Sequence, residues 1–329
     1  MRRIELEDRV VHRSPLTAHV GKSGATLERW LLDDGSTVVV KRLRPATDLL
    51  MQLTHDALAR EYALWAAGVL EHLPEHVEHA ILGGWGEPDG ATVVMRDLAD
   101  RMLTWDDRLD DDRCRWILRR LADVHRAYAR VPLDAWRPAL TPICDFLSMF
   151  SPRRMKAHLD GPSVLPRLAT RGWQLFEELA PQDVARPVLA LLERPAPLVD
   201  ALRGCPCTLV HGDFVVVNMA VDPDTLVLVD WSMTSEAPAA VDVARFVAGC
   251  ASLTDLSREE VIEVYAEAAG AAYHEPSMRL ALLGATVWLG WNKALDASEH
   301  PDPAIRERER DDLDWWVLQA RAALRAGLL

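Results

Sequence analysis

Residues Thr208 to Trp231 read TLVHGDFVVVNMAVDPDTLVLVDW, a β-like segment within a region whose other patterns are helical. The runs Met219 to Asp222 and Leu226 to Val229 are apolar and largely β-branched, and they flank Pro223-Asp224-Thr225. Two such runs joined by a short loop of turn-forming residues predict a β-hairpin. The segment therefore predicts one β interruption inside a mainly helical part of the chain.

The register of this hairpin predicts which side chains lie together. If Asp222 pairs with Leu226, Asn218 lies opposite Asp230 at the open end of the hairpin. Asp213 lies five residues before Asn218, on the loop that leads into the hairpin. Oxygen-only ligand sets suit a hard cation such as Mg²⁺, which takes one or two protein groups plus substrate phosphates. The pattern therefore indicates a magnesium site at this end of the hairpin.

The same residues carry a resemblance to a known family. HGDFVVVN, followed by VLVDW, resembles the Brenner-type phosphotransferase signature, in which an HGD triplet, four residues and Asn precede a hydrophobic strand that ends in Asp. The chain is thus similar to the aminoglycoside phosphotransferase and choline kinase superfamily, which shares the protein-kinase fold. The resemblance implies that Asp213 is the catalytic carboxylate, which orients the attacking hydroxyl or accepts its proton. It implies Asn218 and Asp230 as Mg²⁺ ligands, with His211 bracing the loop and Asp242 tethering it from the start of a helix.

Each of these residues also has a simpler interpretation. A single aspartate or asparagine at such a place is usually a turn or capping residue. For the whole set at this spacing, the catalytic interpretation is favoured.

A kinase needs a cation for the nucleotide phosphates on a strand and a carboxylate on the next helix to hold that cation. Lys41 ends the β-branched run Val38-Val39-Val40. Glu61 lies twenty residues later, on the apolar face of one long helix predicted over Thr47–Leu70. The alternative is a solvated strand end and an exposed helix charge, but the downstream motif favours a Lys41–Glu61 pair.

A kinase also needs a loop that approaches the nucleotide phosphates. The stretch G-K-S-G-A-T at residues 21–26 offers Gly21, Ser23 and Gly24 for this contact. The stretch is neither a Walker loop nor the three-glycine loop of protein kinases, so it is weak evidence by itself.

The segment Val93-Val94-Met95-Arg96-Asp97-Leu98 resembles the one that joins the two lobes in relatives. The resemblance implies that a nucleotide base bonds there to main-chain groups of Arg96 and Leu98. Met95 would line the back of the base pocket.

The chain length and its patterns predict two lobes. We expect an α+β, two-lobed, protein-kinase-like fold, with a strand-rich nucleotide-binding lobe at residues 1–97 and a larger, mainly helical lobe at 98–329 that holds the catalytic loop 208–232 and the acceptor-binding helices. Short apolar runs predict strands at Leu27–Leu32, Ser36–Leu43, Ile81–Trp85 and Ala91–Met95. Helical periodicity predicts helices at Asp111–Ala129, Val164–Leu179, Pro238–Ser252, Arg258–Ala272, Ser277–Ala297 and Ala304–Ala326. The proline-rich stretches between these helices are expected to end helices.

Composition narrows the class of protein. Among 329 residues, 37 Lys and Arg against 50 Asp and Glu give a net charge of −13, which argues against a nucleic-acid binder. The sequence shows no signal peptide, and no apolar stretch reaches the roughly 18 residues of a membrane span. Five cysteines without framework spacing fit a reducing compartment. We therefore expect a cytoplasmic protein with no membrane, nucleic-acid or protein partner.

The acceptor is left open by the sequence. Asp230-Trp231-Ser232 replaces the Asp-Phe-Gly of protein kinases, which favours a small-molecule acceptor over a protein. The acidic balance slightly favours a cationic one. Four tryptophans of the last third could stack on a sugar or an ammonium, although core positions are the more common role at such spacing: Trp288, Trp291, Trp315 and Trp316.

The resulting hypothesis is a kinase that uses ATP or GTP with Mg²⁺ to phosphorylate a hydroxyl of a small molecule, such as an aminoglycoside-like antibiotic, a sugar or an amino alcohol. The alternative is a nucleotide-binding pseudokinase that acts as a regulatory module. The retained Asp213 counts against it, because a binding module does not need a catalytic carboxylate. A metal-dependent hydrolase is a distant third, since it would need more His or carboxylate ligands. Antibiotic resistance and metabolism both remain open as the biological role.

Overall fold

The computed structural model describes residues 6–16 and 26–329. The chain forms two compact units, each built from separate stretches. The first unit holds residues 1–141, 211–235 and 249–271, and the second holds 142–210, 236–248 and 272–329. These units differ from lobes at 1–97 and 98–329, because residues 98–141 and the hairpin segment group with the N-terminal strands. The lobe division itself stays a prediction.

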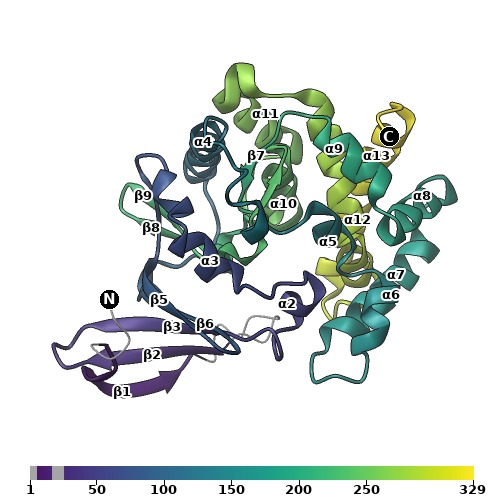
Figure 1. Ribbon diagram of the computed structural model, residues 1–329. Coiled ribbons are helices and arrows are strands. Elements are labelled where there is room, and N and C mark those ends of the chain that lie inside the picture. The colour runs from purple at the N-terminus through teal and green to yellow at the C-terminus, as the bar shows by residue number, and fades with distance from the viewer. Residues whose placement is uncertain (1–5, 17–25) are drawn as a thin grey trace. The chain divides into compact units, whose positions relative to one another are not determined.

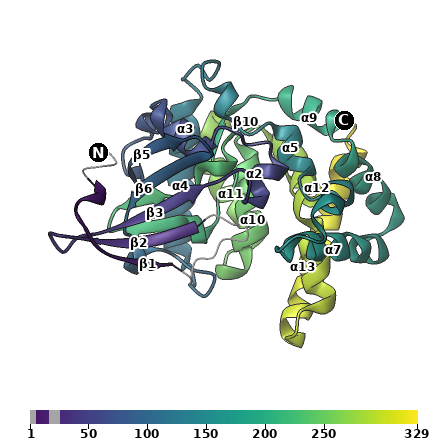
Figure 2. The ribbon, with the colours of Figure 1, turned by 60° about the horizontal axis from the view of Figure 1, so that its bottom comes forward.

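A five-stranded antiparallel sheet dominates the first unit, in the order β1-β2-β3-β6-β5 (Figure 2). The strands are β1 (Val10–Pro15), β2 (Thr26–Leu32), β3 (Thr37–Leu43), β5 (Ile81–Glu87) and β6 (Gly90–Arg96). The four strands predicted from β-branched runs correspond to β2, β3, β5 and β6 and are confirmed. β1 was not predicted, because its sequence VVHRSP offers no apolar alternation.

The two faces of this sheet differ because side chains alternate along each strand. On β3, Val38 and Val40 join the buried cluster around Trp30 and Val94. Lys41 therefore points to the opposite face. This alternation separates an apolar core from the face that carries the lysine.

The single long helix predicted over Thr47–Leu70 is wrong. The segment forms α2 (Leu49–Leu53), α3 (Arg60–Ala66) and the 3₁₀ helix η1 (Val69–His72). His55 and Ala59 have φ angles of 52° and 53°, a left-handed conformation that interrupts a right-handed helix. The buried carboxylate of Asp56 accepts the backbone N–H of Arg60 at 2.9 Å and stabilises the start of α3.

The hairpin forms in the first unit with a register different from the predicted one. β8 (Met219–Asp222) pairs with β9 (Thr225–Leu228), and Asp222 lies opposite Thr225 instead of Leu226. The loop is therefore Pro223-Asp224 alone, and the backbone N–H of Val229 bonds to the carbonyl of Asn218 at 3.0 Å. The bond places Asn218 opposite Val229 just beyond the ladder, and Asp230 is one residue further.

Two helices and one further strand complete the first unit. β4 (Val77–His79) adds to β9 in parallel. α4 (Asp111–Tyr128) packs against α11 (Arg258–Ala269), where the imidazole of His125 bonds the hydroxyl of Tyr265 at 2.8 Å. The remaining turns of the unit are the 3₁₀ helices η2 (Ala99–Arg101), η3 (Arg137–Ala139), η5 (Val216–Asn218), η6 (Trp231–Met233), η7 (Ala251–Leu253) and η8 (Gly270–Ala272).

The second unit is mainly helical and centres on α12 (Glu275–Glu299), which packs against α13 and α7 (Figure 1). Its other elements are α5 (Ile143–Ser148), α6 (Pro152–Met155), η4 (Lys156–His158), α7 (Leu165–Leu179), α8 (Gln182–Glu193), α9 (Ala196–Arg203), β7 (Thr208–Val210), α10 (Ala240–Cys250), α13 (Pro303–Arg325) and β10 (Ser235–Ala237), which pairs with β7. All six predicted helices are present, with ends shifted by a few residues.

The proline-rich stretches begin helices more often than they end them. Pro152, Pro166 and Pro197 lie in the first turns of α6, α7 and α9. Proline fits there because its missing N–H would have no helical partner and its φ is already helical. Pro187 lies inside α8. The expectation that these prolines end helices is therefore wrong at these positions.

Within the described part of the chain, no helix is long and apolar enough to cross a bilayer.

Candidate active site

A buried lysine is held between two carboxylates in the first unit. The Nζ atom of Lys41 lies 2.7 Å from Oε2 of Glu61 and 2.9 Å from Oδ1 of Asp230. The Lys41 and Glu61 side chains are 9% and 1% exposed, whereas Asp230 is 38% exposed. The structure thus brings together three predicted site residues from distant parts of the chain.

Each member of this triad is positioned by a different local element. Lys41 comes from β3 and Glu61 from the first turn of α3. Asp230 follows β9 with a φ of 61°, a left-handed conformation that is uncommon for a residue with a side chain. Strained backbone of this kind persists where the surrounding contacts fix it, and such places cluster at functional sites.

Burial and charge act against each other at the triad. Burial would lower the pKa of Lys41, but the carboxylates of Asp230 and Glu61 reverse that effect and raise it. Burial raises the pKa of Glu61. Burial would also raise the pKa of Asp230, yet the ammonium of Lys41 overcomes it and lowers this pKa to about 2. Lys41 and Asp230 are therefore both charged at neutral pH.

Two contacts around Asp230 were missed by sequence reasoning. The hydroxyl of Ser232 donates to Oδ1 of Asp230 at 2.7 Å. The backbone N–H of Trp231 donates to Oε1 of Glu61 at 3.4 Å. Ser232 follows Asp-Trp, where protein kinases have glycine, and that replacement was the available signal.

The HGD loop is fixed by hydrogen bonds between the His211 ring and main-chain groups. Nε2 of the buried His211 donates to the carbonyl of Val229 at 3.1 Å, and its Nδ1 accepts the N–H of Asp213 at 3.3 Å. Gly212 has a φ of 84°, and a Cβ there would lie 2.1 Å from the carbonyl oxygen of Met233. The loop therefore requires glycine at this position.

Asn218 holds the carboxylate of Asp213. Its Nδ2 donates to Oδ2 of Asp213 at 2.9 Å and to the carbonyl of the same residue at 2.9 Å. Because the amide nitrogen faces Asp213, the amide oxygen is the atom that suits a cation. Two of the three residues predicted to converge are thus in direct contact.

The donor chemistry at this place fits a magnesium ion. The amide oxygen of Asn218 and the partly exposed carboxylate of Asp230 are hard ligands of the number that Mg²⁺ takes beside substrate phosphates. In residues 6–16 and 26–329, no group of three His, Cys, Asp or Glu side chains forms a metal cage. A site with these two protein ligands requires no such cage.

The segment predicted to bind a base ends β6. Met95 is buried, and the N–H of Arg96 donates to the carbonyl of Ala80 at 2.8 Å. The carbonyl of Leu98 accepts N–H groups of Arg101 and Met102 at 2.8 and 3.0 Å. These bonds fix the main chain on both sides of Asp97.

The structure does not test the roles predicted for the phosphate loop and for Asp242. Gly21, Ser23 and Gly24 lie outside the described residues. Asp242 is buried in the first turn of α10, in the second unit, and its role as a tether stays a prediction.

A pocket in the first unit adjoins the triad. Its polar lining includes the buried carboxylates of Asp48 and Asp56 beside Lys41, Glu61 and Asp230. Asp48 caps α2 by accepting the N–H of Met51 at 3.0 Å, and Asp56 accepts the N–H of Arg60 at the start of α3, so both have a structural function.

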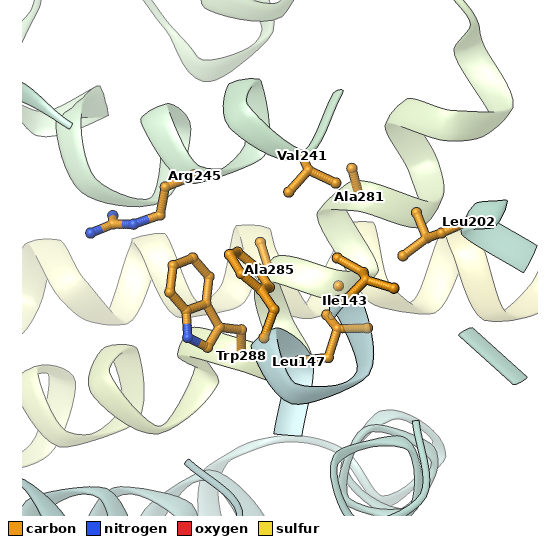
Figure 3. Close-up of a pocket in the computed structure, with 10 residues that line it drawn as sticks. Ile143, Leu147, Leu202, Val241, Arg245, Ala281, Ala285 and Trp288 are labelled. Atoms are coloured by element: carbon orange, nitrogen blue, oxygen red, sulfur yellow. The ribbon is translucent and has the colours of Figure 1, made fainter. Parts of the chain in front are cut away.

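The tryptophans considered for acceptor binding mostly belong to the core of the second unit. Trp288, Trp291 and Trp316 are each at most 5% exposed. Trp288 packs on Phe146, with ring centroids 4.2 Å apart, and lines a small apolar cavity with Ile143 and Ala285 (Figure 3). The core interpretation is therefore confirmed for these three side chains.

Comparison with known proteins places this geometry in a family. Residues 18–280 match the model of the phosphotransferase enzyme family. A comparison with curated protein sequences finds no match.

Solved structures with the same fold cover nearly the whole chain. The GDP and kanamycin complex of APH(2")-IIia shares 13% identity at a TM-score of 0.53, covering 97% of this chain and 94% of that chain. Aminoglycoside phosphotransferase APH(3'')-Id from Streptomyces rimosus shares 18% identity at a TM-score of 0.52, covering 84% and 92%. Spectinomycin phosphotransferase APH(9)-Ia, in complex with ADP and spectinomycin, shares 11% identity at a TM-score of 0.50, covering 95% and 93%. The chain therefore belongs to the phosphotransferase enzyme family, and it is a small-molecule kinase with the kinase-like fold of the aminoglycoside phosphotransferases.

Proposed function

We propose that the enzyme transfers the γ-phosphoryl group of ATP or GTP to a hydroxyl of a small molecule, with Asp213 as the catalytic carboxylate. Two sets of contacts in the first unit support this function. Lys41 is held by Glu61 and Asp230, and Asn218 holds Asp213. A cation for phosphates and a positioned carboxylate are the two parts that phosphoryl transfer requires.

Asp213 would orient the acceptor hydroxyl and take its proton as the oxygen attacks the γ-phosphorus. The new P–O bond forms while the bond to the leaving diphosphate breaks, and the diphosphate keeps the electron pair. The hydrogen bond that Nδ2 of Asn218 donates to Oδ2 of Asp213 fixes the rotamer of this carboxylate, which favours a productive orientation. Most of the rate enhancement in such a reaction comes from positioning and from neutralisation of phosphate charge.

Lys41 would bind the α- and β-phosphates. Its ammonium is already desolvated, so it interacts strongly with an entering anion. Asn218 and Asp230 would hold Mg²⁺, which when bound neutralises charge on the β- and γ-phosphates. We assign the base to the Arg96 carbonyl and the Leu98 N–H. The N–H of Arg96 and the carbonyl of Leu98 bond to other residues of the protein.

Aminoglycoside-like antibiotics, sugars and amino alcohols are the acceptor class we assign. The solved complexes hold kanamycin in APH(2")-IIia and spectinomycin in APH(9)-Ia, and both ligands are small polyhydroxylated molecules. The net charge of −13 favours a cationic acceptor through long-range attraction. None of the five cysteines forms a disulfide, which supports our assignment of the enzyme to the reducing cytoplasm.

The test is release of ADP or GDP in the presence of Mg²⁺ and a panel of aminoglycosides, macrolides, amino alcohols, amino acids and sugars. We expect release that depends on one acceptor and that falls by about 100-fold or more in Asp213→Asn. Nucleotide binding by that variant should remain close to wild type. Equal turnover by Asp213→Asn would contradict the catalytic role. Tight nucleotide binding without turnover across the panel would favour the pseudokinase.

A further inference from the structure

An ion pair ties the second strand of the sheet to the segment assigned to the base. Nε of Arg29 lies 2.6 Å from Oδ2 of Asp97, and Nη2 donates to Oδ1 at 3.1 Å. Arg29 comes from β2, whereas Asp97 directly follows β6. β3 lies between these two strands (Figure 2). The arginine side chain therefore reaches across β3 to the aspartate.

Strand register places this pair on the same face of the sheet as Lys41. Arg29 pairs with Val39, which is two residues from Lys41 on β3 and therefore shares its face. Val39 in turn pairs with Met95. A nucleotide whose phosphates lie at Lys41 and whose base lies at Arg96 and Leu98 would extend along this face.

Asp97 is the residue between the two groups assigned to the base, the Arg96 carbonyl and the Leu98 N–H. Its carboxylate also accepts the N–H of Ala99 at 3.3 Å, which shapes the turn that follows. The side chain is 11% exposed. Burial alone would raise the pKa of Asp97, but bonds from Arg29 and Thr37 lower it, so the carboxylate stays charged.

We infer that Arg29 is a positioning residue for nucleotide binding, which acts by holding Asp97 and hence the main-chain groups that contact the base. The inference rests on the proposed function. The ion pair, together with the 3.1 Å hydrogen bond that Nη2 of Arg29 donates, restricts both partners. The pair therefore orders the segment before the nucleotide binds, and less entropy is lost on binding.

The sheet offers a matched control on its other face. Arg42 and Glu28 form an ion pair of 3.3 Å between the same strands, β2 and β3. Glu28 lies on the face of Trp30, whose indole N–H it accepts at 3.1 Å. The Arg42 and Arg29 side chains are 31% and 35% exposed, so they are similarly accessible. Removing either arginine costs one ion pair, but only Arg29 touches the base segment.

The experiment compares binding of ADP, GDP and inorganic tripolyphosphate, each with Mg²⁺, to the wild type, Arg29→Met, Asp97→Asn and Arg42→Met by calorimetry. For the nucleoside diphosphate that the wild type binds better, we expect Kd to rise about threefold to tenfold in Arg29→Met and in Asp97→Asn. Kd for tripolyphosphate should not change, because it has no base. Arg42→Met should bind all three ligands as the wild type does. Unfolding midpoints confirm that every variant is folded.

The double variant Arg29→Met/Asp97→Asn should bind no more weakly than the weaker single variant, since both changes remove one interaction. Nucleotide binding by Arg29→Met equal to wild type would overturn the inference while leaving the proposed function intact. An equal loss of tripolyphosphate binding would also overturn it, since the effect would then not concern the base. A wild type that binds neither nucleotide would overturn both.

Discussion

The ammonium of Lys41 donates to the carboxylate of Asp230 at 2.9 Å, across a separation of 189 residues. Glu61 holds the same ammonium from its other side. One cation thus connects β3, α3 and the turn after β9 within a single compact unit. Since the cation is buried, we expect its loss to lower the stability of the protein and, under the proposed function, to weaken phosphate binding.

Lys41→Met should destabilise the protein and weaken nucleotide binding. Without the ammonium, the like charges of Glu61 and Asp230 repel each other. Loss of one partner of a buried ion pair lowers the free energy of unfolding by about 3 kcal/mol. Urea unfolding measures the first effect, and calorimetry with ADP and tripolyphosphate measures the second.

Lys293→Met is the matched control for Lys41→Met. Lys293 is also a lysine held by two carboxylates, 2.6 Å from Asp312 and 3.5 Å from Glu309, but its side chain is 15% exposed and it lies in the helical unit. Its loss should reduce the free energy of unfolding by a comparable amount and leave nucleotide binding unchanged. Equal loss of binding in both variants would show that the effect of Lys41 is only structural.

The stability of the protein should depend on Asp230 in the acidic range. Burial opposes the shift, but Lys41 lowers the pKa of Asp230 from its ordinary value of 3.8 to about 2 in the folded state. The unfolded chain therefore binds this proton first as the pH falls. The contribution of Asp230 to stability is complete above pH about 5 and is lost progressively as the pH falls toward 2.

Asp230→Asn removes this titration. We expect the free energy of unfolding to fall less steeply between pH 5 and pH 3 in the variant than in the wild type, measured by urea unfolding. Parallel curves for the two proteins would show that Asp230 is not held as a charged group.

Gly212→Ala should abolish turnover and destabilise the fold. A Cβ at Gly212 would lie 2.1 Å from the Met233 carbonyl oxygen, so the HGD loop would have to move. We expect the free energy of unfolding to fall by more than about 3 kcal/mol, because displacement of the main chain adds to the cost of an alanine in the left-handed conformation.

Gly35→Ala separates these two costs. Gly35 has a φ of 82°, close to the 84° of Gly212, but nothing lies within 4 Å of its added Cβ. The Gly35→Ala variant should lose only about 1 kcal/mol of its free energy of unfolding and keep its catalytic activity. Similar unfolding curves for the two alanine variants would indicate that the contact with Met233 has no consequence.

Two glycines of α12 should respond to alanine in opposite directions. A Cβ at Gly284 meets only Leu147 and Leu198, at 3.4 and 4.0 Å. Gly284 lines the cavity beside Trp288, so this Cβ would partly fill it. A Cβ at Gly290 would lie 3.0 Å from the ring of Phe176. Gly284→Ala should therefore stabilise by about 0.5 to 1 kcal/mol through helix propensity. Gly290→Ala should destabilise by about 1 to 3 kcal/mol through overpacking. Thermal unfolding measures both, and a stabilising Gly290→Ala would contradict this packing.

The strands and the long helices could be predicted from the sequence because their signals are local. Short runs of apolar and β-branched residues predicted β3 and β6, and apolar residues at helical spacing predicted α4 and α12. The HGD motif and its resemblance indicated the family, since five polar residues at that spacing rarely occur together by chance. A chemical role could thus be predicted for these residues from their order and spacing along the chain.

Tertiary structure alone decided the details that depend on backbone conformation or on distant partners. The break between α2 and α3 depends on left-handed conformations at His55 and Ala59, neither of which is a glycine that would announce it. The hairpin register differs by one residue, which moved Asp230 beyond the ladder. The bonds of Ser232 to Asp230 and of Arg29 to Asp97 involve common polar residues with no pattern around them. Such contacts follow from how strands far apart in the chain pack together, and no local periodicity records that packing.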